Sequence, residues 1–261
     1  MCGSGASTAD ALGPAPPLGY TIPVPESPDV TVILVHREGW DRAIRCLAAV
    51  RATVRSCSCE AVLIDNASKD DASSEAVRAA GSLPVTLLRN AGDLGYGSAC
   101  DQGMKLARGR YLLLIDPDVE LAREAVDRAV HHLDLHPDIG VLGGRLVDER
   151  GAYLRGTTGH HPTLGRRLLQ RLGSPYLPPL AGKGCDLRRE PAEPTDVDWV
   201  SPVFLWVRRT AADKGGPLGA RPSDRDRAAA WCRRIRQAGW RVVYFPHAQG
   251  MSRSSDRASF R

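Results

Sequence analysis

An apolar segment near the middle of the chain ends in two carboxylates one residue apart. Residues 110–115 read RYLLLI and lead directly into Asp116-Pro117-Asp118. Such a run is typical of a strand covered on both faces, and strands of this kind belong to open α/β sheets that bind ligands at their C-terminal ends. Two carboxylates at this spacing can hold a hard divalent cation such as Mg²⁺ together with phosphate oxygens. The alternative is a turn that leads into a helix, because Asp and Pro are frequent in turns.

The size and charge of the chain narrow the class of protein. Its 261 residues, of which 43% are hydrophobic and 25% charged, suit one large α/β domain. No apolar run approaches the roughly 20 residues that cross a bilayer, so a soluble, cytoplasmic protein is predicted, with peripheral contact to the inner membrane face left open. The formal net charge of +5 suits an anionic ligand or a membrane surface. No RNA-binding or zinc-finger pattern is present, which disfavours nucleic acid as a partner.

The cysteines and the two ends of the chain give no sign of a site. The seven cysteines lack paired C-x-x-C spacing and are interpreted as reduced, mostly structural thiols. Cys57-Ser58-Cys59 is expected in a loop between a helix and a strand rather than in a metal site. Residues 1–28, rich in Gly, Ala, Ser and Pro, are predicted to be a flexible arm, and residues 251–261 a basic tail.

Strands and helices are predicted to alternate from residue 30 onward. Strands are expected at 30–35, 61–64, 84–88 and in the segment that ends at Asp116, and helices at 41–50, from about 72, at 99–107 and at 120–135. Ser68 or Asp70 is expected to cap the helix near Ala72. Short connections between alternating elements predict a Rossmann-like, mostly parallel sheet with helices on both faces.

The predicted domain spans residues 29–250, and its second half is less regular than its first. The division falls after residue 120, so that 29–120 and 121–250 form the two halves. Strands are expected at 140–147, 197–207 and 241–245, and helices near 164–172 and at 225–238. The stretch 154–194 is rich in Pro, Gly and Arg, and such long irregular segments usually carry substrate contacts or are disordered.

Several local patterns occur in a fixed order along the chain. They are the strand at Val30, Asp65-Asn66-Ala67-Ser68-Lys69-Asp70, the segment from Arg89-Asn90 to Gly103, Asp116-Pro117-Asp118, Val197-Asp198-Trp199-Val200-Ser201, Arg208-Arg209, and Cys232-Arg233-Arg234 running to Gly239-Trp240. In this order they resemble the family 2 glycosyltransferases of the GT-A fold, especially the bacterial rhamnosyltransferase-like branch. The resemblance covers residues 30–246.

The resemblance implies a site for a nucleoside-diphosphate sugar, UDP- or dTDP-linked. Asp65 would contact the nucleotide base, with a helix cap as the alternative, and Gly95-Tyr96-Gly97 would lie beside the ribose and sugar, where small residues allow close approach. Asp116 and Asp118 would bind Mg²⁺ or Mn²⁺ on the diphosphate. The residues implied for the nucleotide sugar are Asp65, Asn66, Asn90, Gly95, Tyr96, Gly97 and Asp116.

The implied chemistry is an inverting, metal-assisted single displacement. The leaving diphosphate is neutralised by the metal and nearby arginines, while a base deprotonates the acceptor hydroxyl. Asp198 and Trp199 resemble the acceptor-side segment, where a ring can stack on a sugar, and a buried strand end is the alternative. The acceptor would be a glycan, a lipid-linked molecule or a small molecule in bacterial polysaccharide or natural-product biosynthesis.

The chain departs from its relatives where the base is expected. The family has a Gly-Gly-Phe-Asp-Glu segment and then a Glu-Asp pair, whereas this chain has Gly215-Gly216-Pro217-Leu218-Gly219 and then Arg227-Ala228. Asp224 or Asp226 could substitute, or could be N-terminal charges that stabilise a helix.

Two smaller departures follow the same comparison. Ser252-Arg253 stands where relatives often carry a metal-binding histidine, and Ser201-Pro202 stands where Ser-Gly is usual.

Three functions therefore stay open at this stage. They are an active transferase with a displaced base, a non-catalytic relative that binds nucleotide or scaffolds a partner enzyme, and a sugar nucleotidyltransferase. A homodimer is also left open. Adjacent side chains on a helix diverge, so His131-His132 is predicted to be a pair of surface histidines rather than a metal site. His160-His161 is placed outside the site.

Overall fold

The computed structural model describes residues 27–160, 185–186, 190–219 and 224–253. The strands are β1 (Val30–His36), β2 (Cys59–Asp65), β3 (Val85–Arg89), β4 (Tyr111–Ile115), β5 (Val119–Leu121), β6 (Ile139–Val147), β7 (Thr158–His160), β8 (Cys185–Asp186), β9 (Thr195–Asp196), β10 (Trp199–Val200), β11 (Phe204–Arg208) and β12 (Arg241–Ser252). The helices are α1 (Trp40–Thr53), α2 (Ser73–Ala80), α3 (Tyr96–Leu106), α4 (Ala125–Leu135), α6 (Arg209–Gly215) and α7 (Asp224–Gln237).

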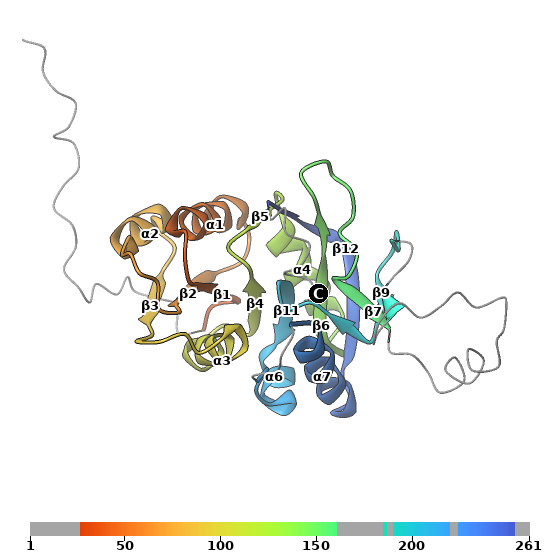
Figure 1. Ribbon diagram of the computed structural model, residues 1–261. Helices are drawn as coiled ribbons and strands as arrows, with labels where there is room; N and C mark the ends of the chain where they lie inside the picture. The colour runs from red at the N-terminus through yellow and green to blue at the C-terminus, as the bar shows by residue number, and fades with distance from the viewer. Residues whose placement is uncertain (1–26, 161–184, 187–189, 220–223, 254–261) are drawn as a thin grey trace, which may run out of the picture.

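Within these residues one mixed sheet of nine strands runs through the molecule (Figure 1). Its order is β3-β2-β1-β4-β11-β6-β12-β5, with β9 paired to β12. The first four strands are parallel, as the alternation of apolar runs and helices predicted. Their C-terminal ends define what we call the ligand edge of the sheet, because ligands of such sheets bind outside the carboxyl ends of the strands.

The strands that follow extend the sheet without reversing its edges. β11 lies antiparallel between β4 and β6, and β12 lies parallel to β6. The register puts Leu112 level with Val242, because Leu112 pairs with Val207, Val207 with Val141, and Val141 with Val242. The start of β12 therefore lies toward the edge opposite to Asp116, which we call the far edge.

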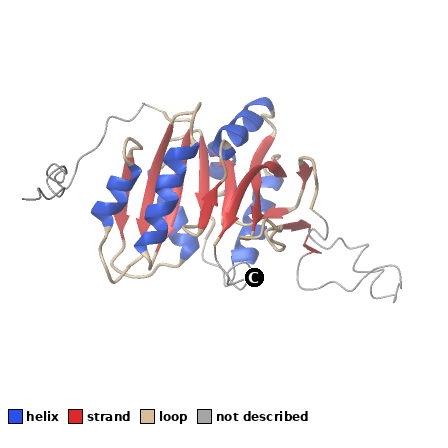
Figure 2. Cartoon of the chain, turned by 90° about the horizontal axis from the view of Figure 1, so that it is seen from above, coloured by secondary structure: helices blue, strands red, loops and turns tan. Residues whose placement is uncertain are grey.

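Helices cover both faces of this sheet. Figure 1 shows α1, α2 and α4 on one face and α3, α6 and α7 on the other, and Figure 2 shows the sheet from above. Trp40, Leu47 and Leu133 belong to the first core, and Trp231 and Ile235 to the second. Because a fully buried large apolar side chain contributes about 1.5–3 kcal/mol, both cores are substantial. The predicted α/β class is thereby confirmed.

The helix predicted at 120–135 is shorter than expected. Its first residues instead form β5, which pairs antiparallel with residues 250–252 of β12. α4 begins only at Ala125, after Glu124 in a left-handed conformation at φ 63°. The periodicity of the sequence could not reveal this, because the strand partner lies about 130 residues away in the chain.

Three other element boundaries are corrected. The strand predicted at 197–207 is two strands, β10 and β11, interrupted at residues 201–203, and the strand predicted at 241–245 continues through Ser252 with an irregularity between Phe245 and Gln249. α3 starts at Tyr96 rather than at residue 99. No side chain caps α2 among the described residues, so neither Ser68 nor Asp70 has the predicted role.

Some predictions lie outside the described residues. These are the arm at 1–26, the short helix near 164–172, His161 and the tail from residue 254. The five cysteines whose state the structure gives, Cys46, Cys57, Cys59, Cys100 and Cys232, are free thiols. In the described part of the chain, no helix is both long and apolar enough to cross a membrane.

Candidate functional site

A cavity opens at the ligand edge beside the two predicted metal-binding aspartates. Its volume is about 460 Å³, and it is lined by Val35, His36, Arg37, Glu38, Arg42, Asp116, Pro117 and Asp118. Three elements converge there: the end of β1, the first turn of α1 and the turn after β4. The cavity therefore brings three carboxylates, those of Glu38, Asp116 and Asp118, and two arginines together at the edge where the sheet topology predicts a ligand.

The Asp-Pro-Asp segment is a tight turn that holds both carboxylates toward this cavity. The Asp116 N–H donates to the Val203 carbonyl at 2.9 Å, and the Asp118 N–H donates to Asp116 Oδ1 at 2.9 Å. The turn closes with the Val119 N–H on the Asp116 carbonyl at 3.0 Å. The alternative interpretation of this motif, a turn before a helix, is only half correct, because the turn leads into β5.

Asp116 and Asp118 fit a divalent cation only if other ligands join them. Among the described residues, no cluster of three or more His, Cys, Asp or Glu side chains could hold a metal. Arg253 stands at the position of the expected histidine. Its guanidinium pairs with the Glu120 carboxylate at 2.7 Å, and its backbone N–H donates to the Asp118 carbonyl at 3.0 Å. Two carboxylates plus phosphate oxygens and water are a ligand set that suits Mg²⁺. The site thus fits a cation that is bound jointly with a phosphorylated ligand.

Asp65 is enclosed rather than open to the cavity. Its side chain is 1% exposed; Oδ1 accepts the Ser68 N–H at 2.8 Å, and Oδ2 lies 3.1 Å from Arg89 Nε. The carboxylate therefore fixes the loop after β2, several residues before α2 begins, and it is not the cap of that helix. In this conformation the Asp65 carboxylate is not accessible to a nucleotide base.

His36 lies opposite Asp65 at the end of β1 and does line the cavity. It is 1% exposed, and its Nε2 has no hydrogen-bond partner among the described residues. Burial lowers the pKa of His36, so the ring is neutral at pH 7. A neutral imidazole can donate or accept one hydrogen bond at this nitrogen.

Asn66 and Asn90 hold the glycine-rich loop in place. Asn66 Nδ2 donates to Asp93 at 2.6 Å, and its Oδ1 accepts from Leu94 N–H and from Asn90 Nδ2, both at 3.1 Å. Gly95 adopts φ 76°, a conformation in which a side chain would be strained. The structure thus gives both asparagines a scaffolding role beside the predicted donor segment.

Tyr96 and Gly97 connect this loop to the second half of the domain. The Tyr96 hydroxyl donates to the Pro202 carbonyl at 2.9 Å. A Cβ at Gly97 would collide with the Gly219 carbonyl and with the Arg227 side chain. The start of α3 and the start of α7 therefore meet at the ligand edge.

Residues 215–219, which the resemblance aligns with the family's Gly-Gly-Phe-Asp-Glu segment, are firmly anchored. The Asp101 carboxylate accepts the N–H groups of Leu218 and Gly219 at 2.7 and 3.0 Å, and Leu218 is 2% exposed. On the other side, Trp231 Nε1 donates to the Gly216 carbonyl at 2.8 Å. This segment carries no carboxylate of its own, but it positions α7.

Asp198 and Trp199 lie far from Asp116 and Asp118, the two aspartates predicted to bind metal. The Val197 N–H donates to the Val242 carbonyl, which puts Asp198 near the start of β12 at the far edge. Strand geometry separates that position from Asp116 by roughly 13 Å along the strands and roughly 14 Å across them. Asp198 contacts Arg236 and lies 3.5 Å from His160 Nδ1, on a second cavity of about 840 Å³.

Trp199 is 1% exposed and packs in the second core. The structure therefore favours the buried-strand interpretation of this residue over stacking on an acceptor.

Asp224 and Asp226 lie at the other end of α7. This helix runs from the ligand edge, where Arg227 meets Gly97, to the far edge, where Arg236 meets Asp198. Ten residues of helix separate Asp226 from Arg236, which is about 15 Å. Asp226 is half-buried, and the side chain of Asp224 lies outside the described residues. Of the three predicted bases, the two on α7 are at the ligand edge and Asp198 is not.

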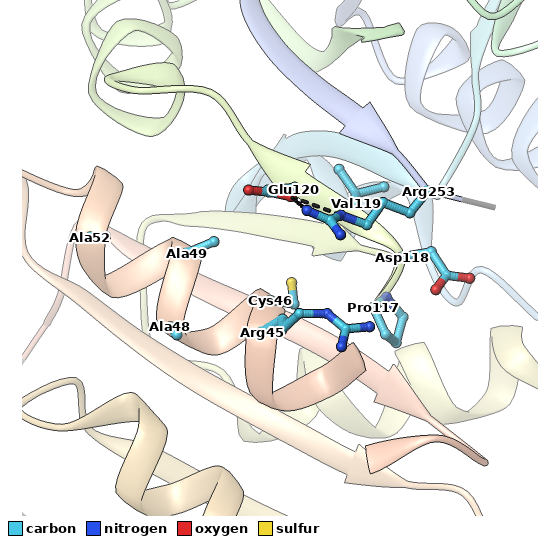
Figure 3. A pocket seen from close by; sticks show the side chains of 10 residues that line it. All are labelled: Arg45, Cys46, Ala48, Ala49, Ala52, Pro117, Asp118, Val119, Glu120 and Arg253. Carbon is cyan, nitrogen blue, oxygen red and sulfur yellow. Dashed lines mark hydrogen bonds and ion pairs between the residues drawn. The ribbon is translucent and has the colours of Figure 1, made fainter. Parts of the chain in front are cut away.

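An apolar pocket of about 330 Å³ adjoins Asp118 on the α1 side. Figure 3 shows Cys46 and Ala49 of α1 facing β5, with the Glu120–Arg253 ion pair at its border. This pocket had no signal in the sequence, because it forms between elements about 70 residues apart.

Several polar cavity residues were also missed, namely His36, Arg37, Glu38 and Arg42. His36, a polar residue that ends an apolar strand, could have been noticed, whereas Arg42 had no signal because its partner Asp118 lies 76 residues away.

His131 and His132 on α4 were both predicted to be surface histidines, and only His131 is. His131 is exposed, but the His132 ring stacks on Phe245 with centroids 4.4 Å apart.

Comparison with known proteins agrees with this geometry. The family model described as glycosyl transferase family 2 matches residues 31–195, more than half of the chain. An N-acetylglucosaminyl-diphospho-decaprenol L-rhamnosyltransferase of Mycobacterium tuberculosis is 28% identical over 201 residues, which cover 72% of this chain and 64% of that protein. The chain thus spans less than two thirds of this relative's length.

Solved structures share the fold at low sequence identity. GalNAc-T7 with UDP, GalNAc and Mn²⁺ matches with a TM-score of 0.63 at 16% identity, covering 87% of this chain and 44% of that one. The mannosyltransferase PcManGT from Pyrobaculum calidifontis, in complex with GDP-Man and Mn²⁺, matches with a TM-score of 0.60 at 18% identity, covering 92% and 61%. The GT-A fold and the predicted resemblance are confirmed, and the chain belongs to glycosyl transferase family 2.

Proposed function

We propose that the protein transfers a sugar from a nucleoside-diphosphate donor, UDP- or dTDP-linked, to an acceptor hydroxyl with inversion. The observation that carries this proposal is the placement of Asp116 and Asp118 on one ligand-edge cavity with Arg37 and Arg42. Membership of the family supports a nucleotide-sugar donor. The far-edge cavity also has two carboxylates one residue apart, Asp196 and Asp198, but these pair with Arg241 and Arg236.

The chemistry of the cavity suits a leaving diphosphate. Asp116 and Asp118 would hold Mg²⁺ or Mn²⁺, and the presence of Mn²⁺ with two of the structural neighbours supports that choice. Such an ion supplies electrostatic stabilisation of the leaving group. Arg37 and Arg42 add positive charge beside the same cavity; their side chains are 64% and 41% exposed, and Arg37 also pairs with Asp93 at 2.9 Å.

The acceptor hydroxyl requires a base at the ligand edge. Asp226, on the first turn of α7, lies at this edge, and we assign the base to it, with Asp224 two residues earlier in the chain as the other candidate. Asp198 is better explained as an anchor for Arg236. Loss of a general base typically costs about 10²- to 10⁴-fold in rate, so the assignment has a measurable consequence.

The relatives support a class of acceptor and a pathway context. A match to a rhamnosyltransferase that acts on N-acetylglucosaminyl-diphospho-decaprenol supports a lipid-linked or glycan acceptor in bacterial polysaccharide assembly, with natural-product biosynthesis as the other context. We propose the reaction class and leave the sugar to experiment.

The test is calorimetric titration of the full chain with UDP, dTDP and GDP, each with and without Mn²⁺. Metal-dependent binding of one nucleotide is expected, and Asp118→Ala should abolish it. Asp138→Ala is the matched control, because Asp138 pairs with Arg241 at the far edge. If no nucleotide binds under any condition, the transferase proposal fails.

One observation favours a second candidate function. Arg227 stands where the family has an acid, and it is buried against the start of α3. A protein that binds nucleotide without turnover, as a scaffold for a partner enzyme, would show the same calorimetric result. An assay of donor hydrolysis, measured as release of nucleoside diphosphate, separates the two functions. An active transferase releases nucleoside diphosphate, and a protein without turnover does not.

A further inference from the structure

We propose that Arg42 is a built-in counter-cation of Asp118, that a divalent cation displaces it, and that the displaced guanidinium then binds the diphosphate. The proposal deepens the proposed function and rests on it, because it concerns the same ligand-edge cavity. It assigns to Arg42 two successive contacts within one binding event.

The contact between the two residues occupies the face of the carboxylate that a cation needs. A single nitrogen, Arg42 Nη1, lies 3.0 Å from Asp118 Oδ2 and 3.2 Å from Oδ1. A divalent ion that used both oxygens would have to approach from the same side. Because two positive charges repel at such distances, guanidinium and metal ion exclude each other at Asp118.

The start of α1 holds the guanidinium in this position. Arg42 Nη2 donates to the Glu38 carbonyl at 2.7 Å. The side chain also crosses Gly39, where an added Cβ would lie 2.8 Å from Arg42 Nε, and where φ is +78°. Gly39 therefore begins the helix and at the same time leaves room for Arg42, so the placement is set by the local fold.

The pair is open enough to be separated. The Arg42 side chain is 41% exposed and that of Asp118 19% exposed. Ion pairs of this exposure shift an equilibrium by a factor of about 5 or less, which a divalent ion with phosphate ligands can overcome. Arg42 is planar with five N–H donors and lines the same cavity, so a short movement brings it to phosphate oxygens.

The experiment measures metal and nucleotide binding separately on the full chain. Mn²⁺ alone is titrated by electron paramagnetic resonance, and UDP and dTDP are then titrated by calorimetry at saturating Mn²⁺. Arg42→Gln should bind Mn²⁺ up to about 5-fold more tightly, because the competing cation is gone. The same variant should bind the nucleotide about 10-fold or more weakly, because a charge-assisted hydrogen bond is lost.

Two further variants make the result specific. Arg45→Gln removes a charge one turn away, from a residue that pairs with Asp41, and should leave both affinities unchanged. Arg42→Lys keeps the charge but not the planar fork, and should fall between wild type and Arg42→Gln for nucleotide. Circular dichroism confirms that each variant is folded.

The outcomes separate this proposal from the proposed function. An Arg42→Gln protein whose Mn²⁺ affinity equals or falls below that of wild type overturns the competition, and so does the absence of Mn²⁺ binding in both proteins. Unchanged nucleotide affinity overturns the second contact. If wild type binds Mn²⁺ but no nucleotide, the proposed function fails, while the metal titration still decides whether Arg42 competes.

Discussion

The two ends of α7 show how differently one sheet uses its acidic residues. At the ligand edge, backbone N–H groups within a single turn set the spacing of Asp116 and Asp118, and the Asp118 carboxylate also contacts Arg42. At the far edge, Asp198 is fixed by Arg236, a residue 38 positions later. Residues that look equally acidic in sequence therefore belong to sites that the helix keeps about 15 Å or more apart.

This comparison shows that the edge of the sheet on which a carboxylate lies decides whether it can act as the base, before its chemistry is considered. A carboxylate at the far edge cannot reach a hydroxyl held beside Asp116, whatever its pKa. The experiments that follow test whether the ligand edge carries the reaction and whether contacts between α3 and α7 hold the two halves together.

The largest expected effect distinguishes the acids at the two ends of α7. Asp226→Asn should lower kcat by about 10²- to 10⁴-fold with little change in KM, because a base is lost and donor contacts are retained. Asp198→Asn should leave kcat nearly unchanged. Steady-state release of nucleoside diphosphate measures both variants, and the reverse ranking would move the reaction centre to the far edge.

The second prediction breaks the contact where the two halves meet. Gly97→Ala should lower the free energy of unfolding by about 3 kcal/mol, because the new methyl group collides with the Gly219 carbonyl and Arg227. Urea denaturation gives the value. Gly92→Ala is the matched control, since a Cβ there meets nothing within 4 Å, and equal stability of the two variants would contradict the close approach.

A third experiment removes the carboxylate that anchors the 215–219 segment. Asp101→Ala should destabilise the protein by about 2 kcal/mol, because two backbone N–H groups lose a charged acceptor. Differential scanning calorimetry follows the loss. Asp213→Ala, an exposed carboxylate on α6, should have almost no effect, and a similar loss in both variants would argue against a specific anchor.

The smallest expected effect concerns pH and the packing of α4 on β12. Burial lowers the pKa of His132 to about 4, whereas an unfolded histidine titrates near 6.5. Between these values the unfolded chain binds more protons, so stability is full above about pH 6.5 and falls as the pH drops toward 4.

His132→Phe removes this titration. Its Tm should fall less than that of wild type between about pH 7 and pH 4.5, whereas His131→Phe, at an exposed position, should follow wild type. If Tm falls equally with pH in all three proteins, protonation of His132 does not destabilise the folded state.

The sequence predicted those parts of the fold that depend on neighbours in the chain. The apolar runs at 30–35 and 110–115 became β1 and β4, and the turn at Asp116 was placed correctly because Pro117 and its flanking aspartates act locally. The parallel order of the first strands followed from short crossovers. This is why the predicted half of the site lies at the ends of these strands.

The remainder depends on contacts that no local pattern records. β5 exists because residues 250–252 pair with it, and the Arg42–Asp118 contact spans 76 residues. The position of Asp198 depends on Val197 pairing with Val242, which periodicity cannot show. Pro202 explains the break between β10 and β11, since proline has no N–H to offer a strand partner.

The anchoring of the 215–219 segment bears on how this sequence diverged from its relatives. Random loss of an active-site loop is expected to leave unmatched amides and empty space. Here Leu218 fills the core, and its N–H and that of Gly219 both meet Asp101. Reintroducing an acid at Leu218 would bury a charge in an apolar core. The 215–219 segment thus has a structural task, because it fixes the start of α7, the helix that carries Asp226.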